Sequence, residues 1–131
     1  MLIFTYGTLK KGLHNNYLLK DSKFIGEAIT KNKYGLFPSV CESFPFAIKS
    51  YADVEIFGEV YEIDNNTLER LDYLEGYPTL YYRETIEVIL NNKIIEATIY
   101  FKNEENNQES VNLNKPISYL NLHFLDYSLH F

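Results

Sequence analysis

The sequence predicts an α+β fold with a largely antiparallel sheet. β-rich segments recur along the chain, a short helix between them carries signals at both ends, and a tight turn joins two long β-rich segments. Strands and a few short helices in mixed order are typical of this class. The chain has 131 residues, 46% of them hydrophobic, so we expect a single domain over residues 1–131 with its own core.

The first predicted strand covers residues 2–6, which are mostly β-branched or aromatic. Gly7 follows it and lets the chain turn sharply into a loop. Residues 13–19 then indicate a short helix, and residues 24–30 return to the composition of a strand.

Two different patterns occupy residues 34–63. Gly, Pro and Ser residues interrupt the aromatics of residues 34–45, which predicts an ordered loop. Residues 54–63 alternate between apolar and polar side chains over much of their length, the period of a half-buried strand. Gly58 interrupts this strand, as at a bulge or a close approach of the backbone.

The best-marked helix is predicted over residues 66–75. Oxygen atoms that could cap its first turn come from Asp64, Asn65 and Asn66. Glu69 stands three residues after Asn66, as in a capping box. Gly76 supplies a left-handed stop, and a proline two residues later prevents continuation.

Residues 81–90 and 93–102 form a predicted β-hairpin. They are joined by Asn91-Asn92, a pair able to adopt the positive φ angles of a two-residue turn. Residues 103–114 are polar and indicate a solvated loop, and Pro116 precedes an aromatic C-terminal segment.

Charge and hydropathy limit the kinds of partner. The 18 acidic and 12 basic residues give a formal charge of −6, and the basic residues are scattered, so no positive stripe matches nucleic-acid phosphates. No apolar run approaches the roughly 20 residues of a membrane-spanning helix, and no basic stretch precedes the apolar start as in a signal peptide. We expect no nucleic-acid or membrane partner and a cytoplasmic location.

Metal-ligating side chains are sparse. Cys41 is the only cysteine, which rules out an internal disulfide and every multi-cysteine metal site. The histidines, His14, His123 and His130, show no pairing with carboxylates at metal-ligand spacing. We therefore expect neither a metal nor another cofactor.

Glu75 is the leading candidate for acid–base chemistry. At about 100° per residue, one arc of the predicted helix is apolar. It is formed by Leu68, Leu71 and Leu74. Glu75 projects between the first two of these leucines, whereas Glu69 and Asp72 lie farther from the centre of the arc. We expect those two to be ordinary solvated acids.

The predicted surroundings of Glu75 favour its protonated form. Partial desolvation disfavours the anion, and the negative end of the helix dipole acts in the same direction. A carboxyl group with a pKa near neutrality can take up a proton in one step and return it in the next. The alternative is a glutamate at a frayed helix end that faces water and has no function.

The turn Tyr6-Gly7-Thr8-Leu9 is the second candidate region. Successive backbone N–H groups in such a turn can form a nest for an anion such as a carboxylate. Thr8 adds a hydroxyl group and Tyr6 a phenol. By itself the motif is weak evidence, because most strands that end in Tyr-Gly only change direction.

Several motifs become informative when taken in order. They are Tyr6-Gly7-Thr8-Leu9, Gly58-Glu59-Val60-Tyr61, Leu71-Asp72-Tyr73-Leu74-Glu75-Gly76-Tyr77-Pro78 and Tyr81-Tyr82-Arg83. This ordered set resembles the γ-glutamylcyclotransferase-like family, and most closely its AIG2-like and γ-glutamylamine cyclotransferase branch. The resemblance covers roughly residues 1–102.

The resemblance implies a small mixed β-barrel with short flanking helices, and a cavity where the Tyr6 loop meets the Glu75 helix. It implies that Glu75 is the catalytic acid/base. It also implies that the loop residues Gly7, Thr8 and Leu9 hold the glutamyl head of the substrate through their backbone N–H groups.

The pocket-lining tyrosines of the family match Tyr82, or Tyr81 in a shifted alignment, and also Tyr100. Beyond Tyr100 the chain departs from the family, because the usual tryptophan-containing C-terminal motif is not recognisable and Trp is absent. The preferred leaving group is therefore open.

The family reaction converts a γ-glutamyl amide into 5-oxoproline and a free amine. The α-amine of the substrate attacks its own γ-carbonyl, so no catalytic Ser or Cys is required. The resemblance thus implies a small γ-glutamyl substrate and two successive roles for Glu75, general base and then general acid.

Two other functions fit the same residues. A non-catalytic binding module for a small amino-acid-like ligand would keep Glu75 and the loop. An interaction protein would use an exposed apolar patch and the polar residues 103–114. The oligomeric state is open.

Overall fold

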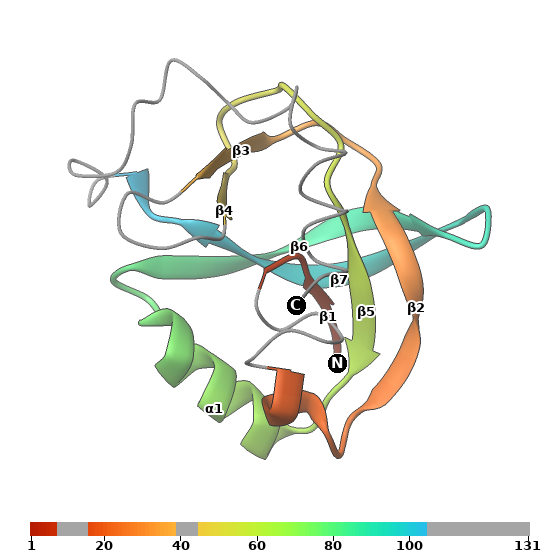
Figure 1. Cartoon of the computed structure of the whole chain (residues 1–131), viewed down its shortest axis with the longest axis vertical. Helices are drawn as coiled ribbons and strands as arrows, with labels where there is room; N and C mark the ends of the chain where they lie inside the picture. The colour runs from red at the N-terminus through yellow and green to blue at the C-terminus, as the bar shows by residue number, and fades with distance from the viewer. Residues whose placement is uncertain (8–15, 39–44, 105–131) are drawn as a thin grey trace.

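A computed structural model of the protein describes residues 1–7, 16–38 and 45–104. Its main feature is a closed barrel with the strand order β1-β5-β2-β6-β7 (Figure 1). The barrel strands are β1 (Leu2–Thr5), β2 (Lys23–Thr30), β5 (Phe57–Glu62), β6 (Tyr81–Leu90) and β7 (Lys93–Lys102). A small second sheet pairs β3 (Gly35–Pro38) with β4 (Pro45–Ile48). The predicted α+β class and the barrel are both confirmed.

One parallel pair closes the barrel. β1 pairs with β5 in antiparallel fashion along its whole length, and on its other side it pairs with β7 in parallel through Ile3 and Thr98. The remaining barrel pairs are antiparallel, as the sequence predicts. Because β1 and β7 lie near opposite ends of the described residues, the pair that closes the barrel joins residues far apart in the sequence.

The β6–β7 hairpin has the predicted bounds. Asn91 and Asn92 have φ angles of 52° and 66°, which is the backbone conformation of a two-residue turn that matches strand twist. The turn sets the register, so that Arg83 lies opposite Tyr100 and Tyr82 opposite Phe101.

The helix α1 (Asn65–Glu75) begins one residue earlier than predicted. Its N-cap is Asp64, whose carboxylate accepts a hydrogen bond from the Thr67 amide at 2.8 Å. The predicted capping box with Asn66 is wrong, because Asn66 already lies inside the helix. The predicted stop is confirmed, since Gly76 has a left-handed φ of 69°.

The loop predicted over residues 34–45 is wrong for Gly35–Pro38, which forms β3. Pro38 pairs with Pro45 at the end of the ladder, where the missing proline N–H groups interrupt no interior hydrogen bond. Gly35 is required by packing, because a Cβ there would lie 2.7 Å from the Cβ of Tyr51. The prolines, which usually break a strand, thus lie at the end of the β3–β4 ladder, and the glycine lies at a tight contact with Tyr51.

The strand predicted over residues 54–63 is shorter in the structure. β5 spans Phe57–Glu62, and Val54 makes only an isolated bridge with Tyr34. The predicted close approach at Gly58 is confirmed, because a Cβ there would lie 2.3 Å from the Thr5 carbonyl oxygen. The register irregularity occurs in β2, between Phe24 and Gly26.

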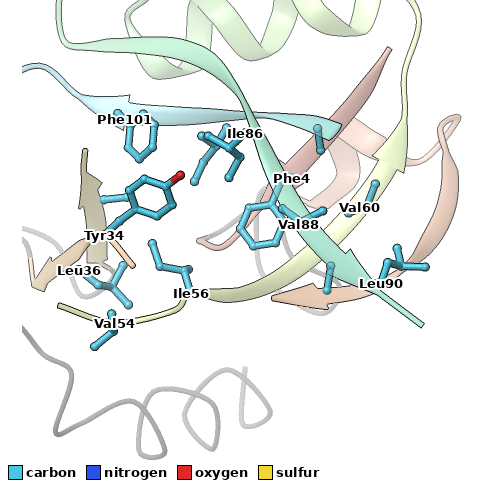
Figure 2. Packing of buried hydrophobic residues seen from close by; sticks show 14 residues of the cluster. Phe4, Tyr34, Leu36, Val54, Ile56, Val60, Ile86, Val88, Leu90 and Phe101 are labelled. Carbon is cyan, nitrogen blue, oxygen red and sulfur yellow. The ribbon is translucent and has the colours of Figure 1, made fainter. Parts of the chain in front are cut away.

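The barrel interior is filled by alternate side chains of every barrel strand (Figure 2). Phe4, Val60, Val88 and Ile99 are examples, each at most 1% exposed. Tyr34 extends this core toward one end, where its ring lies 5.1 Å from that of Phe101 (Figure 2).

A second apolar layer lies between the barrel and the helices. It joins the outward-facing side chains of the barrel to Leu71 of α1 and Leu19 of the short helix η1 (Asn16–Leu19). Figure 1 shows α1 and η1 side by side, away from the β3–β4 sheet. The layer holds α1 against the barrel wall through Leu71. Neither described helix is long and apolar enough to cross a membrane.

Candidate functional site

Glu75 is the last residue of α1 and is half-buried. Burial is the main cause of the raised pKa of the Tyr6 and Tyr100 phenols, and the charge of Glu75 raises both pKa values further. The charge of Glu75 therefore acts on both phenols. Helix α1 thus brings an acid to the place where β1 and β7 meet.

Tyr6 connects three parts of the fold at this place. Its hydroxyl donates to the Tyr100 carbonyl oxygen at 2.8 Å and accepts from the Ala47 amide at 3.0 Å. These bonds tie the end of β1 to β7 and to β4. The phenol oxygen of Tyr6 therefore has a structural task.

The two candidate tyrosines of β6 point to opposite faces of the strand. Tyr81 packs with the layer that contains Leu71, and its phenol is the largest electrostatic influence on Tyr6 after burial itself. Tyr82 packs against Phe101 in the barrel core, with ring centroids 5.9 Å apart. Of the two, only Tyr81 acts on Tyr6 and packs with the layer that holds α1.

The predicted anion-binding loop is described only at its start. Gly7 follows Tyr6 in a bend and is half-buried. A Cβ at Gly7 would meet no heavy atom within 4 Å. Thr8 and Leu9 lie outside the described residues, as do Cys41, His14, His123 and His130.

The prediction that Asp72 is an ordinary solvated acid is wrong. Its carboxylate accepts two hydrogen bonds from Arg83, from Nε at 2.8 Å and Nη2 at 2.9 Å, and a third from the Tyr100 hydroxyl at 2.6 Å. The bonds from Arg83 are the main reason that the pKa of Asp72 is lowered. On the other side, Leu74 is 40% exposed and lies off the buried arc.

Sequence reasoning missed Arg83 as the partner of Asp72, although one signal could have found part of this arrangement. A two-residue turn at Asn91-Asn92 makes Arg83 and Tyr100 cross-strand neighbours. The prediction for Asp72 rested on the positions of the leucines along α1. These positions do not indicate which charged side chains of the sheet the helix packs against.

Glu59 is a buried acid on the outer face of the barrel, 6% exposed. Its carboxylate accepts a hydrogen bond from the Tyr61 hydroxyl at 3.1 Å, and Asn16 donates to the same hydroxyl at 3.1 Å. Burial raises the pKa of Tyr61 to about 12. The described ranges contain no group of three or more His, Cys, Asp or Glu side chains placed to hold a metal ion.

Solved structures with this fold include AIG2-like proteins. An AIG2-like protein from Mus musculus superposes with a TM-score of 0.72 at 26% identity, over 77% of this chain and 76% of the mouse chain. A protein from Pyrococcus horikoshii superposes with a TM-score of 0.67 at 28% identity, over 99% of this chain and 96% of its own.

Sequence comparison leads to the same family. The profile described as γ-glutamyl cyclotransferase, AIG2-like, matches residues 3–119. A relative from Methanocaldococcus jannaschii is 44% identical over 101 residues, covering 76% of this chain and 82% of the relative. The γ-glutamylaminecyclotransferase C of Danio rerio is 36% identical over 126 residues, covering 87% and 81%. The chain belongs to the AIG2-like γ-glutamyl cyclotransferase family, which confirms the resemblance and makes it an enzyme of this type.

Proposed function

We propose that this protein converts a small γ-glutamyl amide into 5-oxoproline and a free amine, with Glu75 as the proton carrier. The observation that carries the proposal is the environment of Glu75, which is half-buried at the end of α1 and whose charge acts on the buried phenols of Tyr6 and Tyr100. Tyr6 immediately precedes the bend at Gly7. Membership of the family supports the same reaction.

The proposed reaction is a ring closure within the substrate. Glu75 removes a proton from the α-ammonium group, and the free amine nitrogen attacks the γ-carbonyl carbon. A new C–N bond forms, and the bond from that carbon to the amide nitrogen then breaks. Glu75 gives its proton to the departing nitrogen. The attacking nitrogen loses its second proton as the lactam forms, and this proton is carried away by the released amine as its ammonium ion, so atoms and charge balance without water and Glu75 is again a carboxylate.

Positioning supplies much of the rate in such a reaction. Well-oriented intramolecular attack reaches effective molarities on the order of 10⁵ to 10⁸ M. In our proposal, backbone N–H groups of Gly7, Thr8 and Leu9 hold the glutamyl carboxylate. Tyr81 is the preferred pocket-lining tyrosine of β6, because Tyr82 faces the barrel core.

The decisive variant is Glu75→Gln, which keeps the shape of the side chain and removes its proton affinity. We expect turnover to fall by roughly 10²- to 10⁴-fold, the range of general acid–base catalysis. The assay is 5-oxoproline release from a panel of γ-glutamyl amines and peptides. The matched control is Glu69→Gln, an exposed acid on the same helix that should retain full activity.

The same variant tests the alternative of a binding module. Undiminished 5-oxoproline release by Glu75→Gln removes this residue from the mechanism. Thermal stabilisation of the unaltered protein by γ-glutamyl compounds without any product supports a protein that only binds them.

Further parts of the proposal follow from the same chemistry. The substrate provides the nucleophile, so we propose that turnover requires no metal or other cofactor. We also propose one domain over residues 1–131, a cytoplasmic location, and no nucleic-acid or membrane partner.

A further inference from the structure

A series of contacts through Tyr100 and Arg83 links the end of β1 to the end of α1. Tyr6 donates to the Tyr100 carbonyl oxygen at 2.8 Å, and the Tyr100 hydroxyl donates to Asp72 at 2.6 Å. Asp72 is held by both Nε and Nη2 of Arg83, and the Arg83 guanidinium lies 4.3 Å from the centre of the Tyr77 ring. The series runs from the end of β1 to the residue after the helix cap.

The series of contacts holds the segment that carries Glu75 from both sides. Asp72 lies three residues before Glu75, and Tyr77 lies two residues after it. The backbone reinforces this arrangement, because the Tyr77 amide donates to the Asp72 carbonyl oxygen at 2.9 Å. Arg83 thus fastens both flanks of Glu75 to β6.

The bond geometry suits a positioning role. A guanidinium that donates two parallel hydrogen bonds to one carboxylate fixes orientation as well as distance. Arg83 and Asp72 are each about one-quarter exposed or less, with side-chain values of 24% and 20%. Solvent therefore competes less with this pair than with the exposed pair Lys31–Glu87.

Charge adds a second constraint. Asp72 and Glu75 are three residues apart on one helix, so their Cβ atoms are neighbours at about 5–6 Å, where like charges repel. Arg83 offsets the charge of Asp72. Within the described part of the chain, the charge of Glu75 acts on the phenols of Tyr6 and Tyr100. Burial raises the pKa of both phenols above their ordinary value, so both stay neutral at neutral pH.

We propose that Arg83, acting through Asp72 and Tyr100, is a positioning residue that sets the place and the charge environment of the Glu75 carboxylate relative to the bend after β1. This inference rests on the proposed function, in which Glu75 moves the proton. It assigns a positioning role to Arg83 and Asp72, and to Tyr100 through the bond that its hydroxyl makes to Asp72.

The test compares Arg83→Gln, Asp72→Asn and the double variant by kcat and KM across pH. We expect kcat to fall by roughly 10- to 100-fold in each single variant, since small misplacements of a catalytic group cost this much. KM should change little, because the loop that holds the substrate is not altered.

The pH profile separates charge from mere packing. Glu75 must be ionised to act as a base, so activity rises with pH through its pKa. We call this rise the acidic limb of the pH profile. Arg83→Gln leaves the Asp72 anion uncompensated, which disfavours ionisation of Glu75, so the limb should move to higher pH. Asp72→Asn leaves the Arg83 cation and should move it to lower pH. The double variant should return the limb toward its original place while kcat stays low.

Two further variants keep the test decisive. Arg83→Lys keeps the charge without the paired bonds, so kcat should fall while the limb stays in place, and it remains informative if Arg83→Gln does not fold. Glu87→Gln, on the same face of β6 in an exposed ion pair, is the control that should leave kcat and the limb unchanged.

The possible failures are distinguishable. If the unaltered protein releases no 5-oxoproline, the proposed function fails. If it turns over and Glu75→Gln does not, but the Arg83 and Asp72 variants keep full kcat, the positioning inference alone is overturned. Equal losses with an unmoved limb also overturn it, because they show a purely structural contribution.

Discussion

At the scale of single residues, two acids of one helix have different surroundings. Asp72 is bonded to Arg83 and Tyr100, which stabilise its anion. Glu75 lies three residues later, beside phenols whose pKa values it raises. Arg83 of β6 pairs with the Asp72 carboxylate and neutralises its charge. This pairing makes Asp72 a structural carboxylate and leaves Glu75 as the candidate catalytic one.

Asp72→Asn should destabilise the protein by about 2 kcal/mol at neutral pH, because it removes hydrogen bonds to a charged partner. The pKa of Asp72 is lowered from 3.8 in the folded state, so its contribution is complete above that value and is lost as the pH falls through the folded pKa. The difference between Asp72→Asn and the unaltered protein should therefore shrink below pH 3.8.

Urea denaturation gives the free energy of unfolding of both proteins. Measurements at about pH 7, 5 and 3 bracket the ordinary aspartate pKa. A gap that is the same at all three pH values would falsify the assignment of this stability to the Asp72 carboxylate.

At the scale of elements, the end of α1 decides where Glu75 stands. Gly76 has a left-handed φ of 69°, and a Cβ there would lie 2.9 Å from Cδ1 of Leu80. The Gly76 amide donates to the Tyr73 carbonyl oxygen, which closes the last turn directly after Glu75. The helix stop is therefore part of the candidate site.

Gly76→Ala should lower the free energy of unfolding by about 1–2 kcal/mol, the cost of a left-handed conformation for a residue with a Cβ. Gly76→Asn also adds a Cβ but tolerates this conformation better, so it should cost less. Chemical denaturation of both variants gives the two values. Equal losses contradict the backbone explanation and indicate the contact with Leu80 instead.

At the scale of the whole molecule, barrel closure depends on close backbone contact between β1 and β5. A Cβ on Gly58 would lie 2.3 Å from the Thr5 carbonyl oxygen and 2.6 Å from Cζ of Phe4. Both strands would have to separate to admit it. Because β1 also pairs with β7, a shift of β1 affects the strand pair that closes the barrel.

Gly58→Ala should therefore destabilise the protein by about 1–3 kcal/mol or more, the range for overpacking of a tight site. Gly7→Ala is the matched control, because a Cβ there meets nothing within 4 Å and its φ is not left-handed. Thermal unfolding of the two variants compares them. A Gly58→Ala protein as stable as Gly7→Ala would show that the strands separate at no cost.

Local signals were sufficient for the elements whose bounds depend on neighbouring residues. The Asn91-Asn92 turn and the left-handed stop at Gly76 were predicted, because each is a preference of the backbone at one or two positions. At Gly58 the sequence predicted a bulge or a close approach, and only the packing of β1 against β5 decided for the close approach. The prediction failed over Gly35–Pro38, where residues that usually break strands lie at the ends of a strand.

The family followed from the order of its motifs along the chain, and Glu75 was singled out by its place on the helix. The surroundings of Glu75 were decided only by the tertiary structure. The parallel contact between β1 and β7 and the bonds of Asp72 to Arg83 and Tyr100 join residues on different elements. Such contacts depend on how the barrel closes and where α1 packs, and no local preference of the chain encodes either.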